Sequence, residues 1–307
     1  MTRVFIDGGH GTTGLEIAAR LSGRHELDLI TLDDERRKDK SARKEAINSA
    51  NIIILCLPDD AAREAVALIE NETTRVIDAS TAHRTDPDWV FGFPEIAGRD
   101  AVANARLVSN PGCYSTGFIA LVAPLVKAGL LPGDWPFVCN AVSGYSGGGK
   151  PMIAEFESGA AATAWRTYAL SLSHKHVPEM QKHCGLAYPP LFAPSVAPTH
   201  RGMIVDVPLM TSAMQGQPTA DALRDALRSA YEGSPIVHVI DSFDEANLTI
   251  ERCASTDRLD LFVFGNADSG QVRLVAAFDN LGKGAGGAAV QSLNLMAGLP
   301  ETAGLRL

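Results

Sequence analysis

The stretch Phe5–Leu21, "FIDGGHGTTGLEIAARL", places a glycine-rich turn between a short apolar run and a helical pattern. Gly9, Gly11 and Gly14 have G-x-G-x-x-G spacing, directly after the predicted strand and before the predicted helix. Glycine lets the backbone turn tightly and approach a pyrophosphate, whose charge then rests on the free amide groups of the helix N-terminus. This context predicts a dinucleotide-binding turn. The alternative is a glycine-rich turn that binds nothing.

Strand and helix patterns continue to alternate through the first hundred residues. The run at 51–58, "NIIILCLP", has no polar alternation, which is typical of a central strand in a parallel sheet. Asp59 or Asp60 can cap the helix that follows. The predicted strands are residues 3–7, 26–32, 51–58 and 75–80. This order predicts βαβ units, and hence an α/β fold with a Rossmann-type, doubly wound parallel sheet.

After residue 110 the pattern changes to longer, alternating segments. In the last of them Val272, Leu274, Ala276 and Phe278 alternate with polar neighbours, which predicts one buried face. Helical patterns lie at 219–232 and 285–297. The predicted strands are residues 136–144, 165–172, 202–210, 235–240, 261–265 and 271–280. They predict a second, α+β domain with a mixed or antiparallel sheet.

Composition bounds the class of protein. A chain of 307 residues with 46% apolar and 21% charged residues is expected to form about two soluble, globular domains. A net charge of −9 without a long basic run argues against nucleic-acid or anionic-membrane partners, and neither a signal segment nor a membrane-spanning run is found. Five widely spread cysteines without a C-x-x-C pattern favour the reducing cytoplasm over a disulfide framework or a thiolate zinc site.

Cys113 stands in "VSNPGCYSTG", at the start of an apolar periodic run. The run predicts a helix with one face turned inward, which Pro124 should kink or shorten and which Ser115 or Thr116 can cap. The helix N-terminus favours a thiolate, so Cys113 is a candidate nucleophile. The alternative is a small buried side chain, which suits Cys56 and Cys139 within their strand patterns better.

A base for that thiol is available in "LSHKHVPEMQKHC". His174 and His176 alternate, so in an extended segment they face the same side, and Glu179 could orient an imidazole. Surface histidines are one alternative. A metal site that also includes His183 is another, although Pro178 breaks the usual spacing of ligands.

The turn "LDDERRKDK" at 32–40 bears on the choice of cofactor. Asp33 or Asp34 could accept a hydrogen bond from a ribose 2′-hydroxyl, as in NAD sites. Arg36, Arg37 and Lys38 could instead hold the 2′-phosphate of NADP, and this basic cluster favours NADP. A solvated charged turn is the alternative for each of these side chains.

The order of motifs resembles the N-acetyl-γ-glutamyl-phosphate reductases, in their shorter form, which are relatives of the aspartate-semialdehyde dehydrogenases. The resemblance covers nearly the whole chain, and "NPGCY" followed by "HKHVPE" is its specific part. Ser115 departs mildly from it, since Pro or Ala is common there. The matching motifs are "GGHGTTG" (8–14), "SNPGCYSTG" (109–117), "SGYSGGGK" (143–150), "HKHVPE" (174–179), "HRGM" (200–203) and "DNLGKGAGGAAVQ" (279–291).

This resemblance implies an activity in arginine biosynthesis: NADPH-dependent reduction of N-acetyl-γ-glutamyl phosphate to N-acetylglutamate 5-semialdehyde, with release of inorganic phosphate. Cys113 would form the thioester, His174 rather than His176 would transfer protons, and Glu179 would orient His174. It also implies a dinucleotide-binding domain at 1–112, completed by a C-terminal helix within 283–307. Residues 113–282 would form the catalytic, substrate-binding and oligomerisation domain of a homodimer or homotetramer.

The resemblance and the motifs together name candidate binding residues. Those for NADP(H) are Gly9, Gly11, Thr12, Thr13, Gly14, Arg36, Ser143, Gly144, Ser146, Gly147 and Asn280. Those for the substrate are Asn110, Arg84 and Arg201, because arginine suits planar recognition of a carboxylate or phosphate. Surface ion pairs and plain turns are the alternatives for these residues.

Three other functions compete with this one. An aspartate-semialdehyde or lysine-pathway dehydrogenase would keep the chemistry and change the acyl phosphate. A metal-dependent hydrolase would use the cluster around His174 and His176. A nucleotide sensor would bind the cofactor without turnover.

Overall fold

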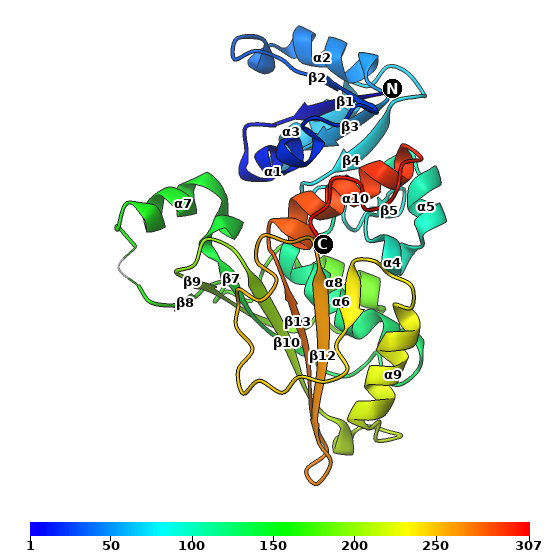
Figure 1. Ribbon diagram of the computed structural model, residues 1–307, viewed down its shortest axis with the longest axis vertical. Coiled ribbons are helices and arrows are strands. Elements are labelled where there is room, and N and C mark those ends of the chain that lie inside the picture. The colour runs from blue at the N-terminus through cyan, green and yellow to red at the C-terminus, as the bar shows by residue number, and fades with distance from the viewer. Residues whose placement is uncertain (162) are drawn as a thin grey trace. The chain divides into compact units, whose positions relative to one another are not determined.

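The computed structural model describes residues 1–161 and 163–307. The chain divides into two compact units, one of residues 1–112 with 285–305 and the other of residues 113–284 with 306–307 (Figure 1). Among the described residues, no helix is both long enough and apolar enough to cross a membrane.

The first unit holds a six-stranded sheet in the order β2-β1-β3-β4-β6-β5, and every neighbouring pair is parallel. Its strands are β1 (Thr2–Asp7), β2 (Leu27–Ile30), β3 (Ile52–Leu55), β4 (Arg75–Asp78), β5 (Val90–Phe91) and β6 (Leu107–Ser109). Its helices are α1 (Thr12–Leu21), η1 (Arg36–Lys38), α2 (Lys40–Ser49), α3 (Asp59–Ala67), α4 (Pro94–Ala97), α5 (Arg99–Asn104) and α10 (Gly287–Met296).

Different helices cover the two faces of this sheet, as the all-apolar strand β3 shows. Ile52 and Ile54 belong to the core formed with α1 and α10, whereas Ile53 and Leu55 belong to the core formed with α2 and α3. A strand buried on both faces needs no polar alternation, which is why "IIIL" is uniformly apolar. The predicted doubly wound parallel sheet is therefore confirmed.

The expected cap of α3 is wrong. Its N-cap is Pro58. Asp59 and Asp60 lie inside the first turn, where the positive end of the helix dipole stabilises their negative charges. The carboxylate of Asp59 instead accepts hydrogen bonds from the backbone nitrogen of Thr81 at 2.9 Å and from its hydroxyl at 2.7 Å. Asp59 thereby ties the loop after β4 to α3.

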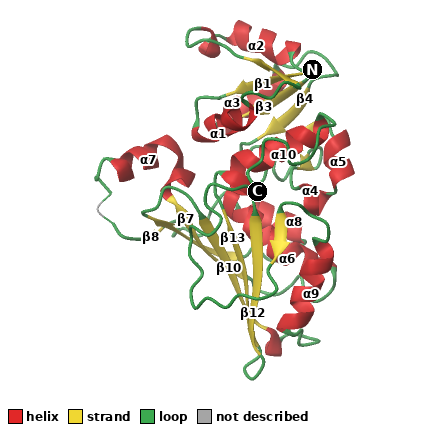
Figure 2. Ribbon diagram, viewed as in Figure 1, coloured by secondary structure: helices red, strands yellow, loops and turns green. Residues whose placement is uncertain are grey.

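The second unit holds a seven-stranded mixed sheet in the order β11-β12-β13-β10-β7-β9-β8 (Figure 2). Only the β7–β9 and β11–β12 pairs are parallel among these described strands. The strands are β7 (Val138–Gly144), β8 (Arg166–Thr167), β9 (Leu191–Ala197), β10 (Met203–Met210), β11 (Val237–Val239), β12 (Leu259–Asn266) and β13 (Gln271–Phe278). The helices are α6 (Cys113–Lys127), η2 (Tyr145–Gly148), α7 (Gly149–Glu157), α8 (Val177–Cys184), η3 (Thr211–Ala213) and α9 (Ala220–Ala230). The mixed sheet confirms the predicted α+β character. The strand expected at 165–172 is wrong in length, since β8 has two residues.

The predicted buried face of β13, with Val272, Leu274, Ala276 and Phe278, is confirmed, but the second half of the strand is buried on the opposite face as well. Ala276 and Phe278 lie on the face that packs against α6, as their alternation predicts. Val275 and Ala277, on the opposite face, are buried with Phe262 because apolar residues between β11 and β12 cover them. That covering segment has no strand or helix period, so its role is not visible in the sequence pattern.

Helix α6 is buried almost all round, so the prediction of a single inward face is wrong. Every residue from Tyr114 to Ala123 is buried, because β10 and β13 lie against the helix together with α8 and α9. A Cβ added at Gly117 would stand 2.8 Å from side-chain atoms of Phe278 and Val205, so the close approach to the sheet needs glycine. Pro124 lies inside one continuous helix and does not shorten it.

Candidate active site

The glycine-rich turn of the first unit leads directly into α1. The Gly11 nitrogen donates to the Gly8 carbonyl oxygen at 3.0 Å, which closes the turn, and α1 begins at Thr12. A Cβ added at Gly14 would stand 2.6 Å from the Gly9 Cα and 2.7 Å from the Gly8 oxygen, so the helix needs glycine there to pack on the turn. Thr12 and Thr13 occupy the first helical turn, where amide groups point out of the helix. These residues fit the pyrophosphate of a dinucleotide.

The charged turn after β2 is built from paired side chains. The Asp33 carboxylate accepts from the Arg36 backbone nitrogen at 2.8 Å and so starts the short helix η1. The Arg37 Nε lies 2.8 Å from Asp34, and the Arg36 guanidinium lies 3.2 Å from Glu45. All of these pairs are largely exposed, so each is weak and open to exchange for a stronger anion.

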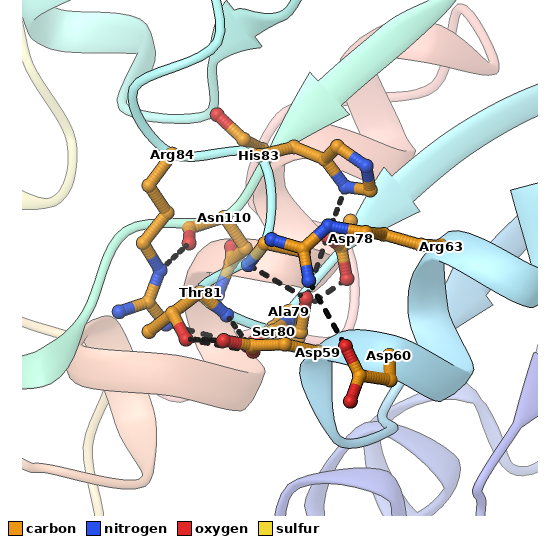
Figure 3. Close-up of polar contacts among 12 residues, drawn as sticks. Asp59, Asp60, Arg63, Asp78, Ala79, Ser80, Thr81, His83, Arg84 and Asn110 are labelled. Carbon is orange, nitrogen blue, oxygen red and sulfur yellow. Dashed lines mark hydrogen bonds and ion pairs between the residues drawn. The ribbon is translucent and has the colours of Figure 1, made fainter. Parts of the chain in front are cut away.

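The loop after β4 is organised by Asp78, a buried carboxylate that the sequence patterns did not single out (Figure 3). One carboxylate oxygen accepts from the Ser80 backbone nitrogen at 2.9 Å. The other lies 2.7 Å from the Ser80 hydroxyl and 2.7 Å from the His83 Nδ1. The His83 ring stacks on Trp89, with ring centroids 4.1 Å apart. Residues 78–83 therefore form a rigid loop at the carboxyl end of the parallel strands.

Arg84 leaves this loop and holds the chain segment that leads to Cys113. Its Nε donates to the Asn110 carbonyl oxygen at 3.0 Å, and its Nη2 donates to the Ala79 carbonyl oxygen at 3.3 Å, as Figure 3 shows. The Asn110 side chain in turn donates to the Ala285 carbonyl oxygen at 3.1 Å. Arg84 thus holds the backbone of Ala79 and Asn110 in place. The predicted substrate contacts of Arg84 and Asn110 stay predictions.

Cys113 is the first residue of α6, and its side chain is partly exposed. Ser115 and Thr116 lie within the helix, so neither can be the cap that the sequence suggested. A Cβ added at Gly284 would stand 3.1 Å from the Cys113 Cβ, which places the backbone of Gly284 against the thiol.

The other four cysteines differ from Cys113 in their surroundings. Burial, with lesser contributions from nearby carboxylates, raises the pKa of Cys56 and Cys253 to about 12. Burial also raises the pKa of Cys139 and Cys184 above the usual value. These four groups therefore remain thiols at neutral pH, and helix N-terminal placement distinguishes Cys113.

His174 and His176 lie side by side within the second unit, but in a turn before α8 and not in the extended segment that their alternation assumed. Their ring centroids are 4.7 Å apart, and the His176 backbone nitrogen donates to the His174 Nδ1 at 3.2 Å. This contact assigns the acceptor role to Nδ1, so a neutral His174 carries its proton on Nε2. The His174 ring also meets Tyr114 edge-on at 6.3 Å, and Tyr114 adjoins Cys113 in the chain. His174 is partly exposed whereas His176 is buried, so His174 is the more accessible of the two.

Two tyrosines that the sequence patterns did not single out complete this cluster. Burial raises the pKa of both Tyr114 and Tyr168, and the nearby Cys113 raises each further. Both phenols are therefore protonated at neutral pH. The Tyr114 hydroxyl donates to the Ser195 carbonyl oxygen at 3.0 Å. Tyr114 was visible in the motif "GCYS", whereas Tyr168 lies in the segment 165–172, which the sequence predicts only as a strand.

A polar network joins β7, β10 and the end of β13. The Arg201 Nε lies 2.7 Å from the Asp279 carboxylate. The side-chain Oδ1 of Asn280 accepts from the Gly202 backbone nitrogen at 3.0 Å, and the Asn280 Nδ2 donates to the Ser146 hydroxyl at 2.9 Å. The structure thus brings three candidate segments, 143–150, 200–203 and 279–291, together within the second unit. The other candidates in the network are Ser143, whose hydroxyl donates to the Gly144 carbonyl oxygen at 2.9 Å, and Gly147, where an added Cβ would stand 3.2 Å from that hydroxyl.

Glu179 lies in the first turn of α8 and is buried. Its predicted role in orienting His174 stays a prediction. Within residues 1–161 and 163–307, no group of three or more His, Cys, Asp and Glu side chains is arranged to hold a metal ion. The alternative of a metal site at His174, His176, Glu179 and His183 therefore gains no support.

Comparison with known proteins gives consistent matches over both units. The model of the semialdehyde dehydrogenase NAD binding domain matches residues 3–105, and that of the semialdehyde dehydrogenase dimerisation domain matches residues 113–280. An N-acetyl-gamma-glutamyl-phosphate reductase of Brucella ovis is 51% identical and covers 96% of this chain and 99% of its own. N-acetyl-gamma-glutamyl-phosphate reductase 2 of Pseudomonas putida is 52% identical and covers 98% of each chain.

Solved structures show the same fold at much lower identity. Aspartate semialdehyde dehydrogenase II of Vibrio cholerae, complexed with ASA, superposes with a TM-score of 0.73 at 17% identity and covers 96% of this chain and 98% of its own. The aspartate semialdehyde dehydrogenase of Francisella tularensis gives 0.70 at 14% identity and covers 96% and 100%. Both likenesses confirm the predicted architecture of a Rossmann-type sheet followed by a second α+β domain.

Proposed function

Because the chain belongs to the semialdehyde dehydrogenase family, and within it to the N-acetyl-γ-glutamyl-phosphate reductases, we propose that it reduces N-acetyl-γ-glutamyl phosphate to N-acetylglutamate 5-semialdehyde with release of phosphate. This is a step of arginine biosynthesis. The observation that carries the proposal is the placement of Cys113 at the start of α6, beside the aromatic cluster that holds His174.

The first half of the reaction is acyl transfer to Cys113. The thiolate attacks the acyl carbon, the bond from that carbon to the phosphate oxygen breaks, and inorganic phosphate leaves as a thioester forms. An acyl phosphate already has a good leaving group, so the protein mainly supplies an activated nucleophile and donors for the developing oxyanion. The amide groups at the start of α6 favour the thiolate. Arg201 is a cation for the anionic ends of the substrate.

The second half is reduction of the thioester to a hemithioacetal, which then releases the aldehyde. When bound, the nicotinamide cofactor supplies the hydride for this step. In its protonated form His174 gives the Nε2 proton to the oxygen that gains negative charge, which becomes the hydroxyl of the hemithioacetal and leaves a neutral imidazole. As the hemithioacetal collapses, that proton is taken back from the hydroxyl, the carbon–sulfur bond breaks and Cys113 is regenerated.

NADP(H) is the proposed cofactor. The glycine-rich turn fits a pyrophosphate, and Gly14 permits the close packing of α1 against that turn. Arg36 and Arg37 support NADP over NAD because their present partners, Glu45 and Asp34, are exposed carboxylates that a 2′-phosphate can replace.

The proposed reaction is tested most directly in reverse. Wild-type protein given N-acetylglutamate 5-semialdehyde, inorganic phosphate and NADP is expected to form NADPH, which is followed by its absorbance. Omitting phosphate should lower the rate at least about tenfold, because phosphate resolves the thioester faster than water does. The value of kcat/KM with NADP should exceed that with NAD at least about tenfold, since the 2′-phosphate adds charge-assisted hydrogen bonds.

The outcomes of this assay separate the competing functions. Turnover of aspartate semialdehyde alone would assign a different substrate to the same chemistry. Cofactor binding without turnover of either aldehyde would favour a sensor. Stoichiometric bound metal with hydrolysis and no NADPH formation would favour a metal-dependent hydrolase.

The protein is proposed to form a homodimer through the outer face of the sheet in the second unit. Support comes from a groove of about 630 Å³ on that face, lined largely by apolar side chains, and from the dimerisation-domain model that matches residues 113–280. In a two-fold dimer the same surface of each protomer faces the other, so both copies of this apolar groove would be covered. The lining residues are Trp135, Pro136, Val138, Pro208, Leu209, Met210, Phe264, Gly265, Asn266, Gln271, Val272 and Arg273.

Light scattering after size-exclusion chromatography tests this surface. The wild type is expected at about twice the chain mass of 32.5 kDa. Met210→Asp should shift the protein toward the monomer, because it places a charge in an apolar interface. Leu170→Asp, a matched change at an exposed position outside the groove, should leave the dimer intact. A monomeric wild type, or equal effects of the two variants, would contradict this interface.

A further inference from the structure

Asp279, at the end of β13, has both carboxylate oxygens engaged although its side chain is fully buried. Its Oδ1 accepts from the backbone nitrogens of Leu281 at 2.8 Å and Gly282 at 3.3 Å. Its Oδ2 accepts from the Ser255 backbone nitrogen and lies 2.7 Å from the Arg201 Nε. One oxygen therefore shapes the turn that follows β13, and the other faces the arginine.

The Arg201 contact is an ion pair in which Nε approaches one carboxylate oxygen of Asp279. Attraction between these two opposite charges at a buried site holds the guanidinium beside the end of β13. The Arg201 side chain is 15% exposed, while Asp279 is inaccessible to solvent. A carboxylate in such a place needs its cation, and the arginine is correspondingly held in one position.

The residue after Asp279 holds the other side of the same turn. Asn280 accepts from the backbone nitrogen of Gly202, the neighbour of Arg201. The turn then continues to Gly284, whose backbone lies against Cys113. Asp279 thus links the position of Arg201 to that of the chain segment beside the nucleophile, through contacts that all lie within the second unit.

From these contacts we infer that Asp279 is a positioning residue, which orients the Arg201 guanidinium toward the anionic substrate. The inference rests on the proposed function, because it assigns Arg201 to that substrate. Asp279 does not touch the reacting atoms. It acts through Arg201, and loss of its charge should therefore weaken substrate binding more than the chemical step.

Asp279→Asn separates the two tasks of this carboxylate. The amide oxygen can still accept from Leu281 and Gly282, but the amide nitrogen would face Arg201 Nε, where two donors meet. In the assay with N-acetylglutamate 5-semialdehyde, phosphate and NADP, we expect KM for the semialdehyde to rise about tenfold and kcat to fall less than about threefold. KM for NADP should change less than about twofold.

A double-mutant cycle with Arg201→Ala identifies the path of the effect. If Asp279 acts through Arg201, adding Asp279→Asn to Arg201→Ala should change KM for the semialdehyde less than about twofold. An undiminished tenfold rise in that background would overturn the inference. So would a single Asp279→Asn variant with the KM of the wild type.

Asp260→Asn is the matched control. Asp260 is another buried carboxylate of the second unit, with the Arg252 Nε at 3.0 Å and the Arg258 Nη2 at 2.9 Å. Its loss should lower the melting temperature without raising KM for the semialdehyde. An equal rise in KM for both variants would mean general destabilisation and would overturn the positioning role.

Two further readouts keep the outcomes distinct. A wild type without phosphate-dependent NADPH formation would refute the proposed function, whereas an active wild type with an unaffected Asp279→Asn variant would refute this inference alone. If Asp279→Asn does not fold, Arg201→Lys leaves the Asp279 backbone contacts in place and removes the guanidinium whose Nε meets Asp279. We expect a tenfold or larger rise in KM for that variant, and an unchanged KM would overturn the inference.

Discussion

Replacing Cys113 by serine is expected to lower kcat for phosphate-dependent formation of NADPH at least about a thousandfold. The reason is chemical. At neutral pH a thiol at a helix N-terminus reaches the thiolate form, whereas a serine hydroxyl in the same place stays protonated and attacks a carbonyl poorly without a stronger base. The assay follows NADPH formation from N-acetylglutamate 5-semialdehyde and NADP for both proteins.

Alkylation supplies an independent readout for Cys113. Thiols with a pKa of about 12, such as Cys56 and Cys253, are thiolate in only about one molecule in 10⁴ at pH 8. Limited iodoacetamide is therefore expected to label Cys113 first, with activity lost in proportion to label. The labelling is carried out in the presence of NADP(H), and mass spectrometry identifies the modified cysteine.

Cys253→Ser is the control for this substitution, because Cys253 is a buried thiol of the same unit, within the segment between β11 and β12. It should keep the wild-type kcat. Equal rates for wild type and Cys113→Ser would rule out a thioester on Cys113, and a loss in Cys253→Ser without loss of stability would point to the wrong cysteine.

Local sequence patterns account for most of the first unit. The run "IIIL" predicts a strand buried on both faces, because a central strand of a parallel sheet packs against helices on both sides. The glycine spacing predicts the turn before α1 because only glycine permits the contact that Gly14 makes with Gly9. In both cases the signal lies within one short run of residues, although the helices that cover β3 include the distant α10.

Contacts between distant residues explain what the patterns missed. The second buried face of β13 depends on the cover provided by residues such as Phe243 and Leu248, whose own sequence has no period. The burial of α6 on all sides depends on α8 and α9, and small residues such as Gly117 carry no hydrophobic signal of their own.

The candidate site divides in the same way. Cys113 and the paired histidines follow from local context and motif order. The carboxylates Asp78 and Asp279 do not, because their function depends on partners that the fold brings to them, namely His83 and Arg201. An aspartate that ends a strand pattern is ambiguous in sequence, since it can equally well face solvent.

Substitution of His174 is the second change with a large expected effect, and it also decides between two histidines. His174→Asn should lower kcat by about 10²–10⁴-fold, the range typical of a lost general acid or base. His176→Asn should cost less than about tenfold in kcat, because the contact that holds the His174 Nδ1 comes from the backbone nitrogen of residue 176 and survives the substitution. Both values are measured in the phosphate-dependent assay.

The pH dependence gives this comparison its mechanistic content. If His174 transfers the proton, the kcat profile of the wild type should contain a limb that reports the titration of this side chain. His174→Asn should remove that limb, and His176→Asn should retain it, because only the His174 side chain is proposed to transfer the proton. The thermal stability of the two variants should change in the opposite order, since the His176 side chain is buried and that of His174 is partly exposed. A larger loss of kcat in His176→Asn than in His174→Asn, at equal stability, would transfer the role to His176. The protein would then use the histidine that is less accessible, with His174 serving only to close the turn before α8.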